Sequence, residues 1–268
     1  MMRLRFVKIS ATGNDFVVID NREGHVQLPR HCPWCRWVCQ RRIAVGADGV
    51  ILVNVSKVAD FAYVHINSDG SIAEMCGNGS RAVAFFAVAE GVASSPTRFE
   101  IGGCIYTARV QGNTVTTEFP PLSAPRLELQ VAEEPFLKDG GFIEVGVPHY
   151  VLFTEEVNGL DVVQLGRKYR QHTAFAPRGT NVDFVQVVAP HVLRMRTYER
   201  GVEDETLACG TGAVAAALIA HARRECRWPV TVHVPGGELT VACNQDGTQL
   251  RLMGTVDPVF EGWLDFPG

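Results

Sequence analysis

Two stretches of the chain, EMCGNGSRAVAFF (residues 74–86) and LACGTGAVAAALI (residues 207–219), carry the same pattern. Each places a cysteine, Cys76 or Cys209, directly before a Gly-x-Gly turn and an almost wholly apolar run. A helix that is apolar on all sides is expected to be buried on all sides. We therefore predict that each half of the chain wraps β-structure around one buried central helix, as an ancient duplication would produce.

The segments around both stretches are predicted to form short β-strands. Runs such as RLRFVKI, GVILVNV and FAYVHI in the first half, and NVDFVQVV, VLRMRTYE and VTVHV in the second, are rich in β-branched and aromatic residues. Helices are expected at residues 79–90, near residues 161–171 and over GAVAAALIAHARR. The Pro-rich stretch FPPLSAPRLELQ at residues 119–130 is the best linker candidate.

These patterns predict an α/β (α+β) protein with two pseudo-symmetric domains, each a curved, mostly antiparallel β-sheet or barrel around a central α-helix. The N-terminal domain is assigned to residues 1–122 and the C-terminal domain to residues 123–254. The tail at about residues 255–268 is assigned as a segment that can pack back on the N-terminal domain. The functional site is expected in the cleft between the domains.

Composition favours a cytoplasmic protein with a small-molecule partner. The chain has 25 basic and 29 acidic residues, a balance that gives no electrostatic reason to expect nucleic acid or an anionic membrane as partner. The start, MMRLRFVKIS, is too short and too charged for a signal peptide, and no apolar stretch has membrane-spanning length.

The eight cysteines are expected to be reduced thiols, because the chain is long and has enough apolar residues for a real core. The segment HCPWCRWVC contains four possible zinc ligands at tight spacing: His31, Cys32, Cys35 and Cys39. The segment is helix-like and lacks the strand-then-helix context of a redox site. We therefore expect its cysteines to pack beside Trp34 and Trp37 rather than to bind metal.

The Cys-Gly-x-Gly pattern has a chemical interpretation. The first amides of a helix have no partner within it and carry positive partial charge, so a Gly-x-Gly helix start suits a carboxylate. A cysteine in that field should have a lowered pKa. If the two thiols flank one carbon, one can remove a proton while the other returns a proton on the opposite face, which inverts the centre. The amides would stabilise the enolate-like charge.

The chain resembles the diaminopimelate epimerase family over nearly its whole length. The resemblance rests on TGNDFVVID, VGADGVIL, INSDGSIAEMCGNGSR, PHYV, RGTNVDFVQV and YERGVEDETLACGTGAVAAA. It implies a PLP-independent isomerase that uses a cysteine pair to interconvert LL-2,6-diaminopimelate and meso-diaminopimelate in lysine and peptidoglycan-precursor biosynthesis. It also implies a homodimer, and no cofactor or metal.

The resemblance also implies roles for individual residues. Cys76 and Cys209 would be the acid–base pair, and His149 would lie close to Cys76. The carboxylate at the reacting centre would be bound by the amides of Gly77, Asn78, Gly210 and Thr211. The other expected substrate contacts are Asn14, Asn67, Asn181, Glu199 and Arg200.

Physical chemistry is consistent with these roles but leaves alternatives. An arginine such as Arg200 can bind a distal carboxylate in bidentate fashion, or it can form a solvated ion pair with Glu199. Asn14 and Asn67 could merely shape turns, and His149 could be a core residue. At the level of the protein, the alternatives are a racemase of another amino acid, such as histidine, and a non-catalytic amino-acid- or metal-binding protein.

The sequence departs from the family pattern at several points. Val147 precedes the PH pair, where family members often have asparagine, and one substrate hydrogen bond would then be lost or replaced. The loop at residues 201–208 is one residue longer than in some family versions. Both changes bear on substrate choice and leave the reaction type as predicted.

Overall fold

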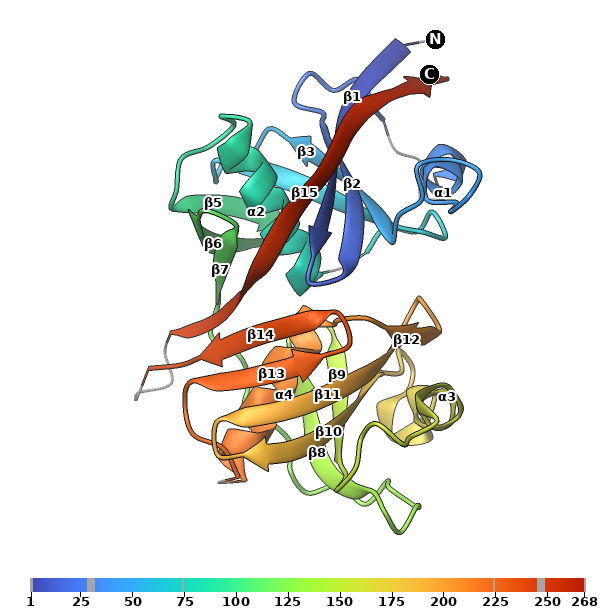
Figure 1. Ribbon diagram of the computed structural model, residues 1–268, viewed down its shortest axis with the longest axis vertical. Coiled ribbons are helices and arrows are strands. Elements are labelled where there is room, and N and C mark those ends of the chain that lie inside the picture. The colour runs from blue at the N-terminus through green and yellow to red at the C-terminus, as the bar shows by residue number, and fades with distance from the viewer. Residues whose placement is uncertain (1, 28–31, 74, 224, 245–248, 268) are drawn as a thin grey trace. The chain divides into compact units, whose positions relative to one another are not determined.

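The computed structural model describes residues 2–27, 32–73, 75–223, 225–244 and 249–267 (Figure 1). The chain divides into two compact units, the first formed by residues 1–118 with 254–268 and the second by residues 119–253. Both units contain β-strands and a central helix, which confirms the predicted fold class. In the described ranges, no helix combines the length and apolarity needed to cross a membrane.

The first unit is a closed barrel. Its strands pair in the order β1 to β7 and then β15, and β15 also pairs with β1, so the sheet returns to its first strand. Strand β15 places Phe266 opposite Met2 and Val256 opposite Ala11 (Figure 1). The strands are β1 Met2–Ala11, β2 Asn14–Asp20, β3 Gly49–Asn54, β4 Phe61–Asn67, β5 Thr97–Ile101, β6 Cys104–Gln111, β7 Thr114–Phe119 and β15 Leu250–Phe266.

The second unit repeats the topology of the first. Successive strand pairs from β1 to β6 are antiparallel, parallel, antiparallel, parallel and antiparallel. The pairs β8–β9, β9–β10, β10–β11, β11–β13 and β13–β14 follow the same order. The strands are β8 Lys138–Glu144, β9 Pro148–Phe153, β10 Asn181–Ala189, β11 Val192–Glu199, β12 Asp204–Thr206, β13 Val230–Val234 and β14 Gly237–Ala242.

Helices provide the crossovers that the parallel pairs require. In the first unit, α1 (Pro33–Val38) precedes β3 and α2 (Gly77–Ala89) precedes β5. In the second unit, α3 (Val162–Arg170) with a short 3₁₀ helix (Thr173–Phe175) precedes β10, and α4 (Gly210–Ala222) precedes β13. The mostly antiparallel sheet that we predicted therefore contains two parallel pairs in each unit.

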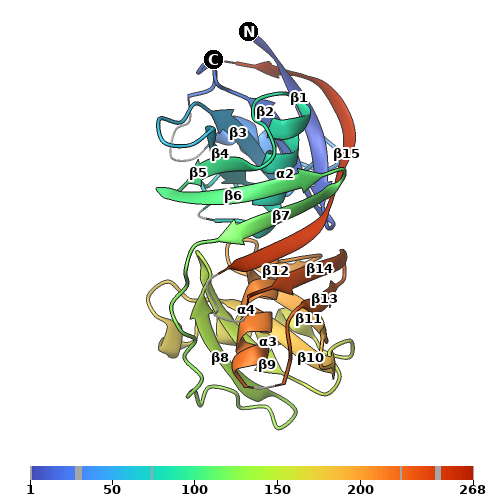
Figure 2. The ribbon, with the colours of Figure 1, turned by 90° about the vertical axis from the view of Figure 1, so that its left-hand side faces the viewer.

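The central helices α2 and α4 are enclosed by the strands of their own units (Figure 2). Helix α2 contacts β1, β2, β3, β5 and β6, and α4 contacts strands from β8 to β14. All residues of α2 up to Ala84 and nearly all of α4 up to Ala220 are buried, as their apolar composition predicted. Runs of Gly and Ala leave room for strands on every side.

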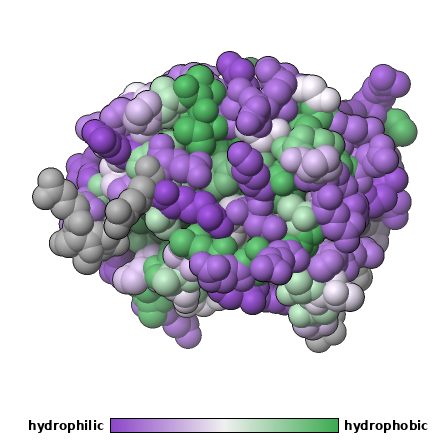
Figure 3. Space-filling view, turned by 90° about the horizontal axis from the view of Figure 1, so that it is seen from below, coloured by the Kyte–Doolittle hydropathy of each residue, from purple (hydrophilic) through white to green (hydrophobic). Residues whose placement is uncertain are grey.

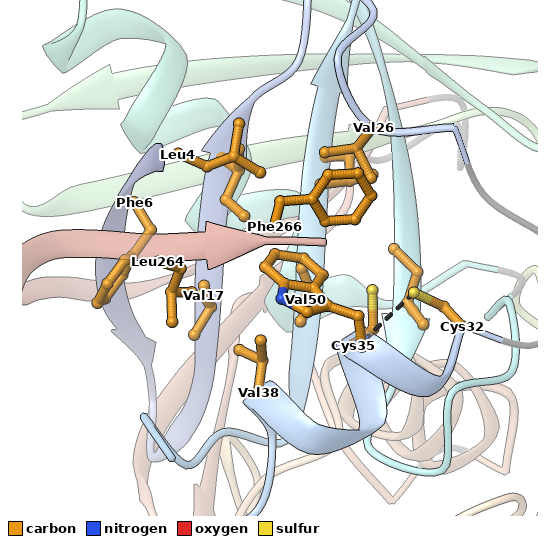
Figure 4. Packing of buried hydrophobic residues seen from close by; sticks show 14 of the residues in the cluster. Leu4, Phe6, Val17, Val26, Cys32, Cys35, Val38, Val50, Leu264 and Phe266 are labelled. Carbon is orange, nitrogen blue, oxygen red and sulfur yellow. Dashed lines mark hydrogen bonds between the residues drawn. The ribbon is translucent and has the colours of Figure 1, made fainter. Parts of the chain in front are cut away.

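The cysteines of the HCPWCRWVC segment pack in the core of the first unit (Figure 4). Cys32 caps α1, and its Sγ accepts a hydrogen bond of 3.2 Å from the Cys35 amide, while Cys39 is also buried. Trp34 lies edge-on to Phe266. Burial raises the pKa of Cys39 to about 12, so this thiol stays protonated at neutral pH.

The prediction for Trp37 was wrong, because this side chain is 43% exposed. Three apolar positions of α1, at Trp34, Cys35 and Val38, already fill the buried face of this short helix. Among the described residues, no group of three or more His, Cys, Asp or Glu side chains is arranged to hold a metal ion. His31 lies outside the described residues.

Helix α3 packs closely against β11 at Gly166, so a larger side chain at this position tests the packing. A Cβ at Gly166 would lie 2.2 Å from the Tyr198 Cβ, which cannot rotate away. Gly166→Val should lower the free energy of unfolding by about 2 kcal/mol, since overpacking costs more than the modest gain in helix propensity. Gly159→Val is the matched control, because a Cβ there first meets an atom at 4.0 Å. Equal urea midpoints for the two variants would contradict this packing.

Candidate active site

Cys76 lies at the start of the buried helix α2. It is the N-cap residue, with extended backbone (φ −128°, ψ 115°), and its Sγ accepts a hydrogen bond of 3.3 Å from the Gly79 amide. Gly77 and Gly79 lie in the first turn, where the free amides of the helix face the cap. This arrangement stabilises negative charge on the Cys76 sulfur.

Two asparagines orient one another beside this cysteine. Asn14, the first residue of β2, donates through Nδ2 to Asp48 Oδ2 at 2.6 Å. Its Oδ1 therefore faces the other way, where it accepts from Asn78 Nδ2 at 3.2 Å and lies 3.9 Å from the Cys76 Sγ. The structure thus brings together Asn14, Cys76 and Asn78, which the sequence assigned to one site.

Asn67 is the last residue of β4 and belongs to a turn. Its Nδ2 donates to Ser71 Oγ at 3.1 Å, and its backbone amide donates to the Ser71 carbonyl at 2.8 Å. These bonds are those of a turn-shaping asparagine, which was the alternative interpretation of this residue. Contact between Asn67 and substrate remains a prediction.

Cys209 occupies the equivalent position in the second unit. It is the N-cap of α4, with nearly the same backbone angles as Cys76 (φ −126°, ψ 108°), and Gly210 and Thr211 follow it in the helix. Its Sγ lies 3.5 Å from the Thr211 hydroxyl, and the residue is 5% exposed.

The expectation of a lowered pKa is wrong for Cys209. Burial raises the pKa of its thiol well above the ordinary value, and the negative charges of Glu199 and Asp183 raise it further. The hydrogen bond between Cys209 and the Thr211 hydroxyl opposes this shift but is outweighed. Desolvation of a fully buried thiolate therefore exceeds the stabilisation by the helix start.

His149 is part of a buried network that leads to Thr211. Its Nδ1 lies 2.7 Å from Asp183 Oδ2 and its Nε2 lies 2.9 Å from the Thr211 hydroxyl. Asp183 also accepts a bond of 2.8 Å from the Thr197 hydroxyl. The contacts that the structure shows for His149 are therefore with the helix start at Cys209, whereas the sequence assigned it to Cys76.

Asn181 connects the network to the YERG segment. It is the first residue of β10 and the parallel-strand partner of His149 in β9. Its Nδ2 donates to the Pro148 carbonyl at 3.1 Å, and its Oδ1 accepts a bond of 2.7 Å from the Arg200 amide. Glu199 is the last residue of β11, close enough to Cys209 to affect its ionisation.

The predicted residues gather at equivalent ends of equivalent strands. In the first unit, Asn14 begins β2 and Asn67 ends β4. In the second unit, His149 lies at the start of β9, Asn181 begins β10 and Glu199 ends β11. The duplication therefore provides two similar half-sites, each built from strand ends and the start of a buried helix.

Sequence reasoning missed three residues that hold these half-sites. Asp48 orients Asn14, Asp183 orients His149, and Arg81 binds the start of α2. All three lie inside the quoted motifs, in GADG, TNVD and GNGSR. Their hydrogen-bond partners depend on tertiary contacts that a single sequence does not display.

The two departures from the family pattern lie in turns. Val147 is in the tight turn between β8 and β9, where the Val145 amide donates to its carbonyl at 2.9 Å. The longer loop after Arg200 contains β12, which pairs with β11. Glu203 fastens this loop, because its carboxylate accepts from Arg170 at 2.9 Å.

A cavity of about 780 Å³ in the second unit contains none of the predicted site residues. Phe136, Lys138, Phe153, Leu160 and Arg223 are among the residues that line it. Because no predicted site residue lines this cavity, we do not assign the substrate to it.

Solved structures with the same fold include amino-acid epimerases. A hydroxyproline epimerase from Agrobacterium vitis, solved with bound trans-4-hydroxy-L-proline, matches with a TM-score of 0.73 at 16% identity and covers 99% of this chain and 94% of its own. A PhzF-family phenazine biosynthesis protein from Bacillus anthracis matches with a TM-score of 0.75 at 14% identity, covering 99% and 100%. The fold is thus that of the two-unit class shared by such epimerases and PhzF-family proteins.

The sequence narrows this class to one family. The diaminopimelate epimerase family model matches residues 6–118 and 141–259. The diaminopimelate epimerase of Aquifex aeolicus is 42% identical, covering 97% of this chain and 98% of its own, and that of Chlorobaculum tepidum is 40% identical, covering 96% and 99%. The chain belongs to the diaminopimelate epimerase family.

The raised pKa of Cys209 predicts how this thiol reacts. In a Cys76→Ala chain, alkylation of Cys209 should accelerate only above the pH range of an ordinary thiol, because the thiolate is the nucleophile. Glu199→Gln should shift the pH profile of alkylation downward and speed the reaction at pH 8 by about threefold or more, since it removes one nearby negative charge. Asp204→Asn, which removes an exposed carboxylate from β12, is the control. Identical profiles for both variants would refute the effect of Glu199.

Proposed function

We propose that the chain is a diaminopimelate epimerase, an isomerase that interconverts LL-2,6-diaminopimelate and meso-diaminopimelate. Membership of the family supports this activity, and its relatives named diaminopimelate epimerase align over almost their full length. One structural observation carries the proposal: Cys76 and Cys209 cap equivalent helices of two repeated units, in nearly identical backbone conformations.

In the proposed mechanism, one cysteine as thiolate removes the α-proton and the other as thiol delivers a proton to the opposite face. The carbon is inverted, one proton is taken up and one is released, and the reverse reaction exchanges the two roles. Loss of the α-proton places negative charge on the neighbouring carboxylate. The amides of Gly77, Asn78, Gly210 and Thr211 would stabilise that charge as preorganised donors.

The surroundings of Cys76 suit the thiolate that removes a proton, and those of Cys209 suit the thiol that delivers one. The Gly79 amide supports a thiolate at Cys76, while burial keeps Cys209 in the thiol form. His149, held by Asp183, can exchange a proton with the Thr211 hydroxyl next to Cys209. The acid and base chemistry is then supplied by side chains, without PLP or a metal.

The distal amino-acid end of the substrate is assigned to residues near the end of β11. Arg200 would bind the distal carboxylate and Asn181 would add a polar contact, while Glu199 would offset an ammonium group. The Asn181 Oδ1 already accepts from the Arg200 amide, so the two residues are held at one place. The side-chain amides of Asn14 and Asn67 in the first unit would contact the reacting end of the substrate.

We further propose a homodimer that acts in the cytoplasm, in lysine and peptidoglycan-precursor biosynthesis, as the family resemblance implies. On the face shown in Figure 3, hydrophobic residues lie scattered among hydrophilic ones. Sedimentation of the purified chain tests the dimer, and a monomer at micromolar concentration would refute it.

Removal of either thiol should stop epimerisation. Cys76→Ala and Cys209→Ala should each lower kcat by about 10²-fold to 10⁴-fold, because each removes one member of the acid–base pair. Cys104→Ala, which removes an exposed thiol, should keep the activity of the unaltered chain. The assay is chiral separation of products from LL-diaminopimelate, and near-normal turnover by either site variant would refute the two-base mechanism.

Solvent deuterium and a substrate panel test the chemistry and the substrate separately. In D₂O, the unaltered enzyme should place deuterium at the α-carbon of its product, since the incoming proton comes from a thiol that exchanges with solvent.

Turnover of histidine or another single amino acid in place of diaminopimelate would identify a racemase with a different substrate. Ligand binding without proton exchange would indicate a non-catalytic amino-acid-binding protein.

A further inference from the structure

Arg81 is a buried cation in the second turn of α2. Its side chain is 0% exposed and is among the largest of the fully buried side chains. Among the residues that the structure describes, no carboxylate forms an ion pair with it. Buried charges in proteins are normally paired, because an isolated charge loses its hydration without compensation. An unpaired buried guanidinium therefore needs a functional explanation.

Within the described part of the chain, the acceptors of Arg81 are all neutral and lie around the helix start. Nη1 donates to the Gly77 carbonyl at 3.2 Å, and Nη2 donates to Asn78 Oδ1 at 2.8 Å and to the Thr12 hydroxyl at 3.1 Å. Nε is buried without a hydrogen-bond partner. The guanidinium thus keeps its full charge directly behind the two residues that follow Cys76.

We infer that Arg81 supplies the positive charge that keeps Cys76 as the thiolate in the resting enzyme. The inference rests on the proposed function of Cys76 as one member of the acid–base pair. The thiolate serves as the missing counter-charge of the guanidinium, and the guanidinium in turn stabilises the thiolate. Through Asn78, the same side chain orients the amide network that reaches Asn14 and Cys76.

The ionisation of Arg81 is consistent with this role. Burial lowers its pKa to about 10, and negative charge on Cys76 opposes that shift. A pKa of about 10 leaves the guanidinium charged at neutral pH, so it can act on a neighbouring thiol. In a site with low dielectric, such a charge acts more strongly than it would in water.

Among the described residues, the other titratable groups around α2 are neutral, paired or exposed. Burial lowers the pKa of His65 to about 4 and raises the pKa of Tyr63 far above its ordinary value, so both are uncharged at neutral pH. The charged groups in ion pairs are Lys8 with Asp15, Arg41 with Asp15 and Asp48, and Arg5 with Glu90 and Glu261. The remaining charged groups on β5 and β6 are Arg98, Glu100 and Arg109, of which both arginines are exposed and Glu100 binds Ser56.

The second unit lacks this cation. When the two motifs are aligned on their cysteines, Val214 of α4 stands where α2 has Arg81, and Val214 is buried. Cys209 has the carboxylates of Glu199 and Asp183 nearby instead, and they disfavour its thiolate. The repeated fold therefore places opposite charges beside its two cysteines, which favours the thiolate at Cys76 and the thiol at Cys209.

The test is the pH dependence of Cys76 alkylation by iodoacetamide in a Cys209→Ala chain, read at the Cys76 peptide by mass spectrometry. Arg81→Gln keeps polar contacts but removes the charge, and should raise the midpoint by about one pH unit, so that alkylation is about tenfold slower at pH values below both midpoints. Arg81→Lys should stay near the parent. Tyr63→Phe is the control, because it removes the 2.8 Å contact with Ser80 of α2 without changing charge.

Three results would overturn the inference. One is an Arg81→Gln midpoint within about 0.3 pH unit of the parent, and another is an equal shift in Tyr63→Phe. The third needs no change at Arg81: a parent midpoint at or above that of an ordinary thiol, about 8.5, refutes the role even if the Arg81 variants do not fold. Alkylation needs no substrate, so a chain with the expected shifts but no epimerase activity would refute the proposed function and leave the role of Arg81 intact.

Discussion

The free amides at the starts of two buried helices are the constraint on which the site depends. Strands surround α2 and α4 and bury most of the side chains of these helices, so we expect chemistry at a helix end. At the N-terminal end, unsatisfied amides carry partial positive charge. A cysteine in that position satisfies one amide through its sulfur, as Cys76 does, and in the proposed mechanism the same sulfur transfers a proton.

The same fold produces two chemically different cysteines. Backbone angles at Cys76 and Cys209 are nearly equal, so the difference comes from side chains that the two repeats do not share. Arg81 lies behind one helix start, while the second is flanked by Glu199 and by the pair of Asp183 with His149. Duplication accounts for the shared geometry and later substitution for the difference in charge, and the proposed proton transfer needs both.

Much of the architecture could be predicted because it depends on local pattern. The apolar runs after Cys76 and Cys209 indicated buried helices, and alternating β-branched residues indicated the strands. The parallel pairs could not be read from the sequence, because strand order depends on which segments meet in space. The pKa of Cys209 was predicted in the wrong direction for the same kind of reason, since burial by distant strands outweighs the local field of the helix.

One strand contributes to both units. Strand β15 begins at Leu250 in the second unit and ends at Phe266 opposite Met2 in the first, so a late segment of the sequence pairs with an early one. The barrel of the first unit can therefore close only after β15 has been made, although its other strands all precede the second unit in the sequence. Until β15 is made, the edges at β1 and β7 lack this partner and are open to pairing with other molecules.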